Sequence, residues 1–320
     1  MKQYNLGLDL TSRNTRKGKF LDEMERVVPW AQLLALIEPL ALRKERGRPP
    51  LGAEVMLRIH FLQQWFGLSD VAMGEALSDV PLYRQFAGLS GMNRLPFRVS
   101  ILRCRHLLEQ HDLAPKMLEA VNATLAAKGL MLKEGTAVDA SLIAAPSSTK
   151  NNMGTRDPEM LQTKKGNQWY FGMKCHIGVD AESGLVHTVV CTAANVNDVT
   201  PTHAPVHGEE ADVFADAAYQ GVDKREGTLD IRARWHISLR PGLRRLLDTT
   251  DPKGSIAEEI KHVKARIRAK VKEPFRVIKR QFGYVKVRYR GLAKNTAQLH
   301  TLFALSNLWM ARQQLMADQG

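Results

Sequence analysis

Cysteine is scarce in this sequence. The 320 residues contain three, Cys104, Cys175 and Cys191, and they are widely separated. An odd count argues against a disulfide framework, and none of the spacings is that of a zinc-binding motif. We expect reduced thiols, as in a cytoplasmic protein.

Long hydrophobic runs are also missing. No apolar stretch reaches the roughly 18 residues that a membrane-spanning helix needs. Residues 1–5 do not start the hydrophobic core of a signal peptide. The composition is otherwise ordinary for a globular protein, and 320 residues can form a sizeable core and two domains. We therefore expect a cytoplasmic protein with no membrane partner.

Positive charge is present in excess. The formal net charge is +13. Residues 224–290 hold 20 Lys and Arg against 7 Asp and Glu, so this segment alone carries +13 and the rest is near neutral. A basic segment of this density in a folded region predicts a polyanionic partner, most simply nucleic acid. The alternative is a basic surface without a partner.

Residues 1–130 have the periodicity of helices. Between about 50 and 90 the pattern is helix, turn and helix, and Ser69 or Asp70 can cap the second helix. Further helices follow up to Gly129, a suitable C-terminal cap. Helix-turn-helix units often bind DNA, but short helical bundles are also common without that role.

From residue 131 the periodicity becomes that of strands. The predicted strands are 136–143, 169–180, 186–192, 212–215 and 235–239. A long, basic, mobile loop is expected at 146–167, and a short helix is expected before the fourth strand. This order of elements matches an α/β (α+β) fold with a five-stranded mixed sheet, flanking helices and the first strand at its centre.

Two helices are expected to complete the chain. A long basic helix at 256–283 has apolar residues at three- and four-residue steps. Pro274 lies inside it and should kink or restart it, because proline removes one backbone hydrogen bond. An apolar helix at 299–310 is expected to close the fold.

Two aspartates follow strand-like runs. Asp139 lies in the first predicted strand, and Asp216 follows the run Val213–Ala215. Open α/β sheets place their sites at the carboxyl ends of strands, and carboxylates on neighbouring strands suit Mg²⁺. The alternative for each residue alone is that it caps a turn.

Four longer motifs identify a family resemblance. They are Leu57–Phe66 (LRIHFLQQWF), Lys165–Lys174 (KGNQWYFGMK), Ala215–Gly221 (ADAAYQG) and Pro274–Tyr284 (PFRVIKRQFGY). Together they resemble the bacterial insertion-sequence transposases of the DDE type, in the "insertion sequence five" group of the "insertion sequence four"-like set. The resemblance covers nearly the whole chain.

The resemblance implies a fold and an activity. It implies a helical DNA-binding region at 1–130 and an RNase H-like catalytic domain at 131–320. Two aspartates and a glutamate of that domain hold two Mg²⁺ or Mn²⁺ ions, which serve DNA cleavage and strand transfer. Asp139 and Asp216 match the two aspartate positions. The implied partners are the terminal inverted repeats, target DNA and a second copy of the chain, in the bacterial cytoplasm at the nucleoid.

The third carboxylate departs from the family pattern. Arg268 and Lys279 keep the family's frame, but the glutamate position between them holds Lys272, and Glu273 comes one residue late. In a regular helix Glu273 is turned by about 100° from Lys272 and points to solvent. A lysine about 6 Å from Mg²⁺ would be repelled by roughly 5 kcal/mol at an effective dielectric of about 20.

Two outcomes follow for this departure. If the helix breaks at Pro274, Glu273 can turn inward as the third catalytic ligand. Otherwise the chain is a catalytically impaired or repurposed transposase that acts as a DNA-binding protein, and the helix geometry favours this outcome. A second departure, Phe97–Ser100, replaces acidic and small residues and either alters a DNA contact or reflects drift.

Other candidate residues are basic, aromatic or histidine. The basic residues expected to contact DNA phosphate are Lys164, Lys165, Arg268, Arg276, Lys279 and Arg280. Trp169, Tyr170 and Phe171 are expected to pack in a strand or core, with stacking of Trp169 on a flipped base as the alternative. The histidines near the catalytic region lack metal-ligand spacing, and structural or surface roles are expected for His176, His187, His203 and His207.

Overall fold

The computed structural model describes residues 15–40, 50–89, 95–132, 134–201, 205–208, 210–222, 228, 231–238 and 262–318. Its N-terminal part is helical, as predicted. The helices are α1 (Arg16–Val27), α2 (Trp30–Ile37), the 3₁₀ turn η1 (Glu38–Leu40), α3 (Ala53–Phe66), α4 (Asp70–Asp79), α5 (Pro81–Phe86), α6 (Arg98–Gln110) and α7 (Leu113–Ala127). No helix in the described part of the chain combines the length and apolarity that crossing a bilayer requires.

The predicted helix, turn and helix is α3 followed by α4. Gly67 ends α3 with φ +64, a left-handed conformation that glycine adopts without strain. Ser69 caps α4, and its Oγ accepts a hydrogen bond from the Ala72 amide at 3.1 Å. Gly129, with φ +68, follows α7 as expected.

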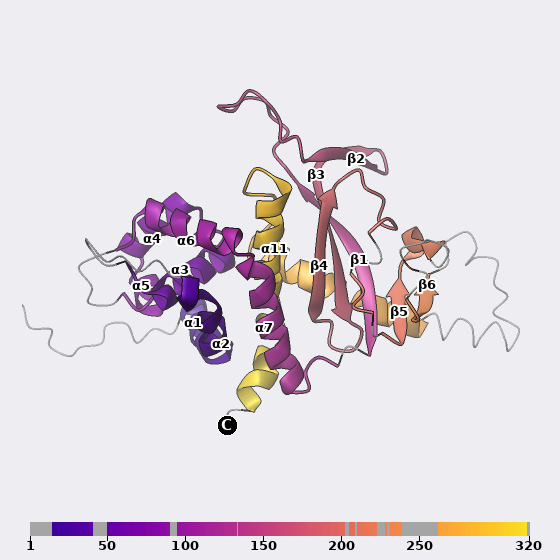
Figure 1. Cartoon of the computed structure of the whole chain (residues 1–320), viewed down its shortest axis with the longest axis horizontal. Helices are drawn as coiled ribbons and strands as arrows, with labels where there is room; N and C mark the ends of the chain where they lie inside the picture. Colours follow the sequence, from indigo (N-terminus) through magenta and orange to yellow (C-terminus); the bar gives the residue numbers. More distant parts are fainter. Residues whose placement is uncertain are drawn as a thin grey trace, which may run out of the picture.

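A mixed sheet forms the second half of the fold (Figure 1). Its strands are β1 (Gly135–Ala144), β2 (Leu161–Lys165), β3 (Gln168–Asp180), β4 (Val186–Ala193), β5 (Asp212–Ala215) and β6 (Arg234–Ile237). The order is β2-β3-β1-β5-β6, with β4 also paired to β3. β3 is antiparallel to β1, β2 and β4, whereas β1, β5 and β6 are parallel. The first strand is central, as predicted.

The sheet of the described residues has six strands, so the prediction of five was wrong. The extra strand is β2, which falls in the predicted loop 146–167. It pairs with the start of β3 through a tight turn at Gly166, where φ is +62. All of its residues are exposed or half-buried, so it lacks the alternation of apolar and polar residues by which a half-buried strand is recognised.

The segment before β5 also differs from the prediction. No helix forms in its described residues, which run through turns from 194 to 201 and at 205–208. The Asn197 carbonyl accepts from the Thr200 amide at 3.0 Å, which closes one of these turns. Asparagine and proline favour such turns over helix, and Pro201 and Pro205 lie within the segment.

The predicted long basic helix is interrupted, as Pro274 suggested. Its residues 256–261 lie outside the described residues. Residues 262–269 are helical, and a turn at 270–271 separates them from α10 (Lys272–Arg276) and the π-helical η5 (Val277–Gln281). Pro274 is the third residue of α10, where its missing amide hydrogen costs no helical hydrogen bond.

The predicted last helix is α11 (Leu292–Ala317), which lies with α7 between the N-terminal helices and the sheet (Figure 1). A smaller hydrophobic cluster lies around β5 and β6, and the main core joins the N-terminal helices, α7 and α11 to β1, β3 and β4. A buried amide pair links them: Asn307 Nδ2 donates to Asn122 Oδ1 at 2.8 Å and to the Val186 carbonyl at 2.7 Å. The Val186 amide donates back to Asn307 Oδ1 at 2.9 Å. β4 is therefore held to both helices by polar contacts.

Candidate active site

The two aspartates come from neighbouring parallel strands. In the β1–β5 register, Ala137 is paired with Phe214. Continuing that register by two residues places Asp139 beside Asp216. Both side chains therefore lie on the same face and at the carboxyl end of the parallel pairing, where an open α/β sheet presents its ligands.

Each aspartate also has a local hydrogen bond. Asp139 Oδ1 accepts from the Ala140 amide at 2.8 Å. Asp216 caps the 3₁₀ turn η2 (Ala217–Tyr219), and its Oδ1 accepts from the Ala218 amide at 2.8 Å. The turn-capping alternative therefore holds for Asp216, but one oxygen in a cap leaves the second oxygen for another ligand.

The environment of Asp139 disfavours its charge. Burial raises the pKa of the Asp139 carboxyl from 3.8 to about 6. The charges of Asp216 and Asp198 raise this pKa too, whereas the Ala140 amide and the Lys272 ammonium lower it. A bound cation would relieve the same repulsion, so the pair is suited to a positive ligand.

The glutamate of the expected triad points elsewhere. The Glu273 carboxylate Oε2 lies 2.6 Å from Arg276 Nη2 and accepts from Arg276 Nε at 2.8 Å. Among the described residues, the carboxylates of Asp139, Asp216 and Glu273 do not form a group in which all three lie within 4.8 Å of one another. Lys272 acts electrostatically on Asp139, but no ion pair within 4.0 Å joins it to either aspartate in the described chain.

The two residues that frame position 272 in the family pattern point into the fold. Lys279 Nζ donates to Ser141 Oγ at 2.5 Å, on the face of β1 that carries Asp139. Burial lowers the pKa of Lys279 and the charge of Lys165 lowers it further, while Cys175 and Asp139 raise it. Arg268 Nη1 donates to Ser238 Oγ at 2.5 Å, just after β6.

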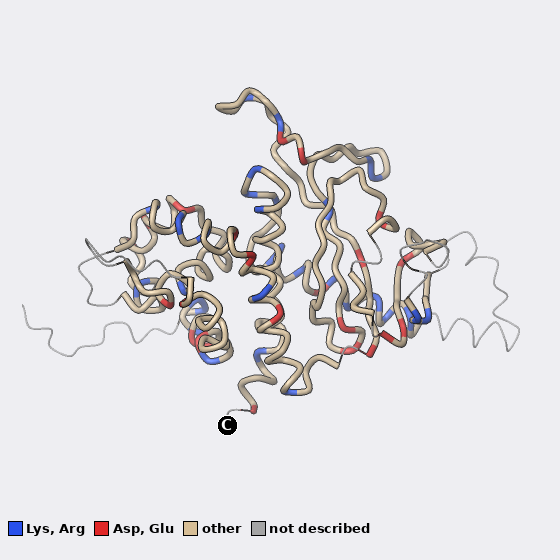
Figure 2. The backbone as a smooth tube through the Cα atoms, in the orientation of Figure 1, with Lys and Arg blue, Asp and Glu red and all other residues tan. Residues whose placement is uncertain are grey.

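The remaining basic candidates are exposed. Arg276 and Arg280 lie on the outer side of α10 and η5, and Lys164 and Lys165 lie on β2. Lys164 is paired with Trp169 in the β2–β3 register. Trp169 lies in β3 but is 64% exposed, so of the two expected roles it has the strand position and not the core packing. Figure 2 shows basic residues at this hairpin turn, whereas acidic residues gather at the other end of the strands, where β1 begins.

Sequence reasoning missed two residues near the aspartates. Asp198, expected only as a helix cap, lies 2.8 Å from Lys174 Nζ. Tyr219 is 1% exposed, and its hydroxyl has no hydrogen-bond partner among the described residues. Burial raises the pKa of Tyr219, and the charges of Asp139, Asp198 and Asp216 raise it further. The position of Tyr219 in the Ala215–Gly221 motif was the signal that could have found it.

His176 is one of the histidines for which a structural or surface role was expected. It is 1% exposed, and its Nε2 lies 3.0 Å from Thr192 Oγ1. Burial lowers the pKa of His176 to about 4, so it is neutral at pH 7. The three cysteines are free, as expected. His203 lies outside the described residues.

Two models of known families match this chain. Residues 131–308 match the model of the transposase DDE domain, and residues 8–107 match a transposase domain (DUF772). A search of solved structures returned no match. The first match covers more than half of the 320 residues and includes both aspartates. The chain therefore belongs to the transposases with a DDE domain.

Proposed function

We propose that the chain is an insertion-sequence transposase that binds terminal inverted repeats and catalyses metal-dependent DNA cleavage and strand transfer. The observation that carries this proposal is the placement of Asp139 beside Asp216 at the carboxyl end of two parallel strands. An RNase H-like catalytic domain at 131–320, preceded by a DNA-binding region at 1–130, is part of the proposal. So are the "insertion sequence five" grouping and the bacterial cytoplasm at the nucleoid as its location.

The residues of this site fit a divalent cation in part. Asp139 and Asp216 would hold Mg²⁺ or Mn²⁺, and the unpartnered Tyr219 hydroxyl is a group that bound water can satisfy. Two such ions, when bound, supply Lewis-acid stabilisation of the attacking and leaving oxygens in phosphoryl transfer. Glu273 would have to leave Arg276 to become a third carboxylate ligand.

The chain's own cations support binding of a phosphate backbone. Lys279 places an ammonium on the face of β1 that carries Asp139, where it can orient a phosphate near the carboxylates. Lys164, Lys165, Arg276 and Arg280 are exposed and suited to non-specific contacts with double-stranded DNA. Arg268 would act by positioning the end of β6 through Ser238. A homodimer that pairs two DNA ends completes the proposal.

One observation favours a second candidate function. Lys272 stands at the glutamate position and acts on Asp139, while Glu273 is held by Arg276. A chain with this arrangement would bind DNA but cleave it weakly, as a catalytically impaired or repurposed transposase. The two candidates differ in chemistry and agree in DNA binding.

Cleavage of a terminal-repeat duplex by the full chain tests both candidates. We expect cleavage that requires Mn²⁺ or Mg²⁺ and is lost in Asp139→Asn. DNA binding with no metal-dependent cleavage would favour the second candidate. Absence of both binding and cleavage would contradict the two together.

A further inference from the structure

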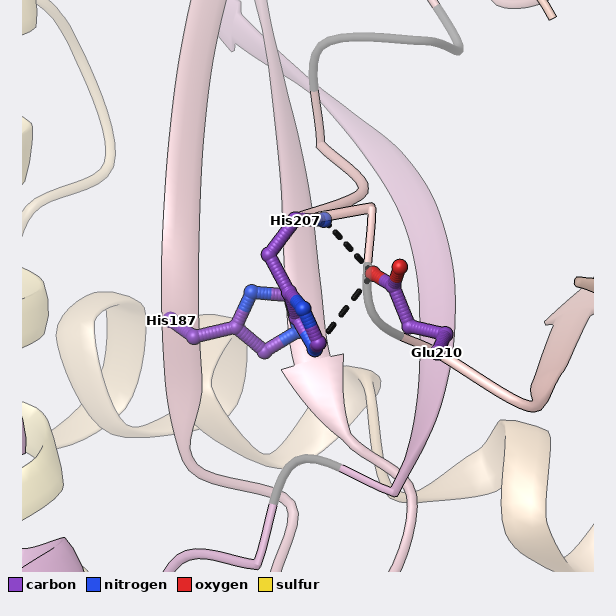
Figure 3. A group of neighbouring side chains, drawn as sticks. All are labelled: His187, His207 and Glu210. Carbon is purple, nitrogen blue, oxygen red and sulfur yellow. Dashed lines mark hydrogen bonds and ion pairs between the residues drawn. The ribbon is translucent and has the colours of Figure 1, made fainter. Parts of the chain in front are cut away.

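Two histidines and a glutamate, His187, His207 and Glu210, converge beside the sheet (Figure 3). His187 comes from β4, and His207 and Glu210 come from the connection before β5. Their nearest ligand atoms all lie within 4.8 Å of one another. The two histidines are 20 residues apart in the sequence, so spacing could not identify this group.

A β-bulge turns His187 toward this group. In the β3–β4 register Gly178 is paired with Thr188, whereas Val179 is paired with Val186, so His187 is the extra residue. Regular alternation would put His187 on the face of Val189, which belongs to the main core. The bulge instead lets His187 Nε2 approach Thr136 Oγ1 at 3.0 Å on the opposite face.

The neighbouring contacts hold the bulge in place. The Val186 amide and carbonyl are both bonded by the buried Asn307 side chain. Gly178 lies beneath His187, and a Cβ there would come 1.9 Å from the Pro205 carbonyl oxygen and 2.6 Å from His187 Cε1. A residue without a side chain is therefore needed at position 178 for the two segments to meet.

Glu210 supplies a buried carboxylate. It is 5% exposed. Oε1 accepts from the His207 amide at 2.6 Å and from Thr136 Oγ1 at 3.1 Å, and Oε2 accepts from the Gly208 amide at 2.7 Å. These bonds fix the carboxylate oxygens beside the two imidazoles, whose ring centroids are 5.0 Å apart.

One pair of ligand atoms has the spacing found in a transition-metal site. His207 Nε2 and Glu210 Oε1 are 3.5 Å apart, near the ~3.4 Å edge of a tetrahedron with bonds of about 2.1 Å. His187 Nδ1 lies 2.9 Å from Thr188 Oγ1. The Thr136 hydroxyl gives its one hydrogen to Glu210, so without an ion His187 Nε2–H donates to Thr136 and Nδ1 accepts from Thr188. Metal binding needs the other tautomer, in which Nδ1–H donates to Thr188 and the Nε2 lone pair binds the ion, the usual support of a metal-bound histidine. Imidazole nitrogens favour Zn²⁺ over Mg²⁺.

We propose that His187, His207 and Glu210 bind one Zn²⁺ ion, which ties the connection before β5 to β4. Water would complete the tetrahedral coordination. The ion would bridge β4 and the connection before β5, which already meet through the contact of the two imidazole rings and through hydrogen bonds to Thr136, and its role would be structural. This site is separate from the Mg²⁺ or Mn²⁺ site, because Thr136 and Asp139 are three residues apart on β1 and point to opposite faces.

Zinc binding by the full chain tests this proposal. The protein is stripped with a chelator, and Zn²⁺ is then titrated against a chromophoric competitor while Tm is followed in parallel. We expect one Zn²⁺ per chain at this site, a higher Tm with Zn²⁺, and no replacement by Mg²⁺. A Co²⁺-substituted protein should show the visible absorption of tetrahedral nitrogen and oxygen ligation.

Variants assign the ligands. His207→Ala keeps the backbone amide that bonds Glu210, so it tests the imidazole while that hydrogen bond stays in place. It should weaken Zn²⁺ binding by at least about tenfold and abolish the Tm increase, and so should His187→Gln. His236→Gln is the matched control, because His236 is also partly buried beside a carboxylate, at 2.6 Å from Asp212 Oδ1.

The outcome is separable from that of the proposed function. Asp139→Asn should leave the Zn²⁺ stoichiometry unchanged whether or not the chain cleaves DNA. A folded wild-type chain that takes up no stoichiometric Zn²⁺, or ligand variants that bind it like the wild type, would overturn the zinc site. The three residues would then form a hydrogen-bonded cluster only.

Discussion

The Glu273 carboxylate is bound to Arg276 one helical turn further along the chain, with Oε2 2.6 Å from Nη2. This contact occupies the only acidic residue of α10. The preceding residue, Lys272, acts on Asp139 instead. The helix restarts before Pro274, but the restart does not bring Glu273 to the aspartates. We therefore expect the third carboxylate to be the feature that most affects the proposed catalysis.

Restoring a carboxylate at position 272 should increase cleavage. We expect Lys272→Glu to raise the rate of Mg²⁺-dependent cleavage of a terminal-repeat duplex by about tenfold or more, because it removes a cation and adds a ligand. Single-turnover cleavage at saturating protein measures the change. Lys272→Met, which removes the charge without adding a ligand, should give a smaller increase.

A matched control separates this effect from net charge. Lys264→Glu makes the same charge change in the preceding helical segment and should leave the rate unchanged or lower it through weaker DNA binding. A wild-type chain already as active as Lys272→Glu would show that position 272 does not limit the reaction.

Removing the charge of Asp216 should stop cleavage and preserve the fold. Asparagine keeps an acceptor oxygen for the Ala218 amide, so η2 should retain its cap in Asp216→Asn. We expect no detectable metal-dependent cleavage, DNA affinity within about twofold of the wild type and an unchanged Tm. Asp212→Asn, at the start of the same strand, is the control and should still cleave. Loss of DNA binding or a large fall in Tm in Asp216→Asn would indicate a structural role.

Much of this arrangement is readable in the sequence because it depends on local patterns. The apolar run before Asp216 predicts a buried strand with a carboxylate at its end, and the structure has that strand. Ser69 predicts a helix start, and Pro274 predicts the interruption of the basic helix. In each case neighbouring residues alone determine the backbone, so periodicity and capping rules suffice.

The rest depends on contacts between distant segments. β2 is exposed on both faces, so its strand conformation comes from pairing with β3 and not from its own pattern. His187 reaches His207 only because a bulge shifts the register of β4. Trp169 is exposed because the hairpin extends from the sheet rather than packing on it. Such features need the tertiary structure.

Metal binding at the aspartate pair should depend on pH. Because the pKa of Asp139 is raised to about 6, protonation competes with the cation below this pH. We expect the affinity for Mn²⁺, measured by electron paramagnetic resonance, to be about tenfold lower at pH 5 than at pH 7. An affinity that is the same at both values would contradict the raised pKa.

The same shift has a consequence for stability. The native state holds the Asp139 proton to a higher pH than the unfolded chain, so unfolding releases a proton between about pH 4 and 6. The neutral Asp139 carboxyl therefore favours the folded state. This stabilisation is complete below about pH 4 and is lost as the pH rises through about 6. Urea unfolding without divalent cations should show a steeper fall over this range in the wild type than in Asp139→Asn.

The β2–β3 hairpin should contribute to DNA binding mainly through charge. Removing both exposed ammonium groups in Lys164→Ala/Lys165→Ala should weaken binding to any duplex. It should also reduce the slope of log affinity against log salt by about 1.8, or about 0.9 for each phosphate that is no longer neutralised. Fluorescence anisotropy at several salt concentrations measures both quantities. Lys116→Ala, an exposed change on α7, should alter neither. An unchanged slope in the double lysine variant would place the phosphate contacts elsewhere, on the exposed side of α10 and η5.

Trp169→Ala should lower affinity without changing the salt slope if the exposed ring stacks on a base, because stacking releases no counterions.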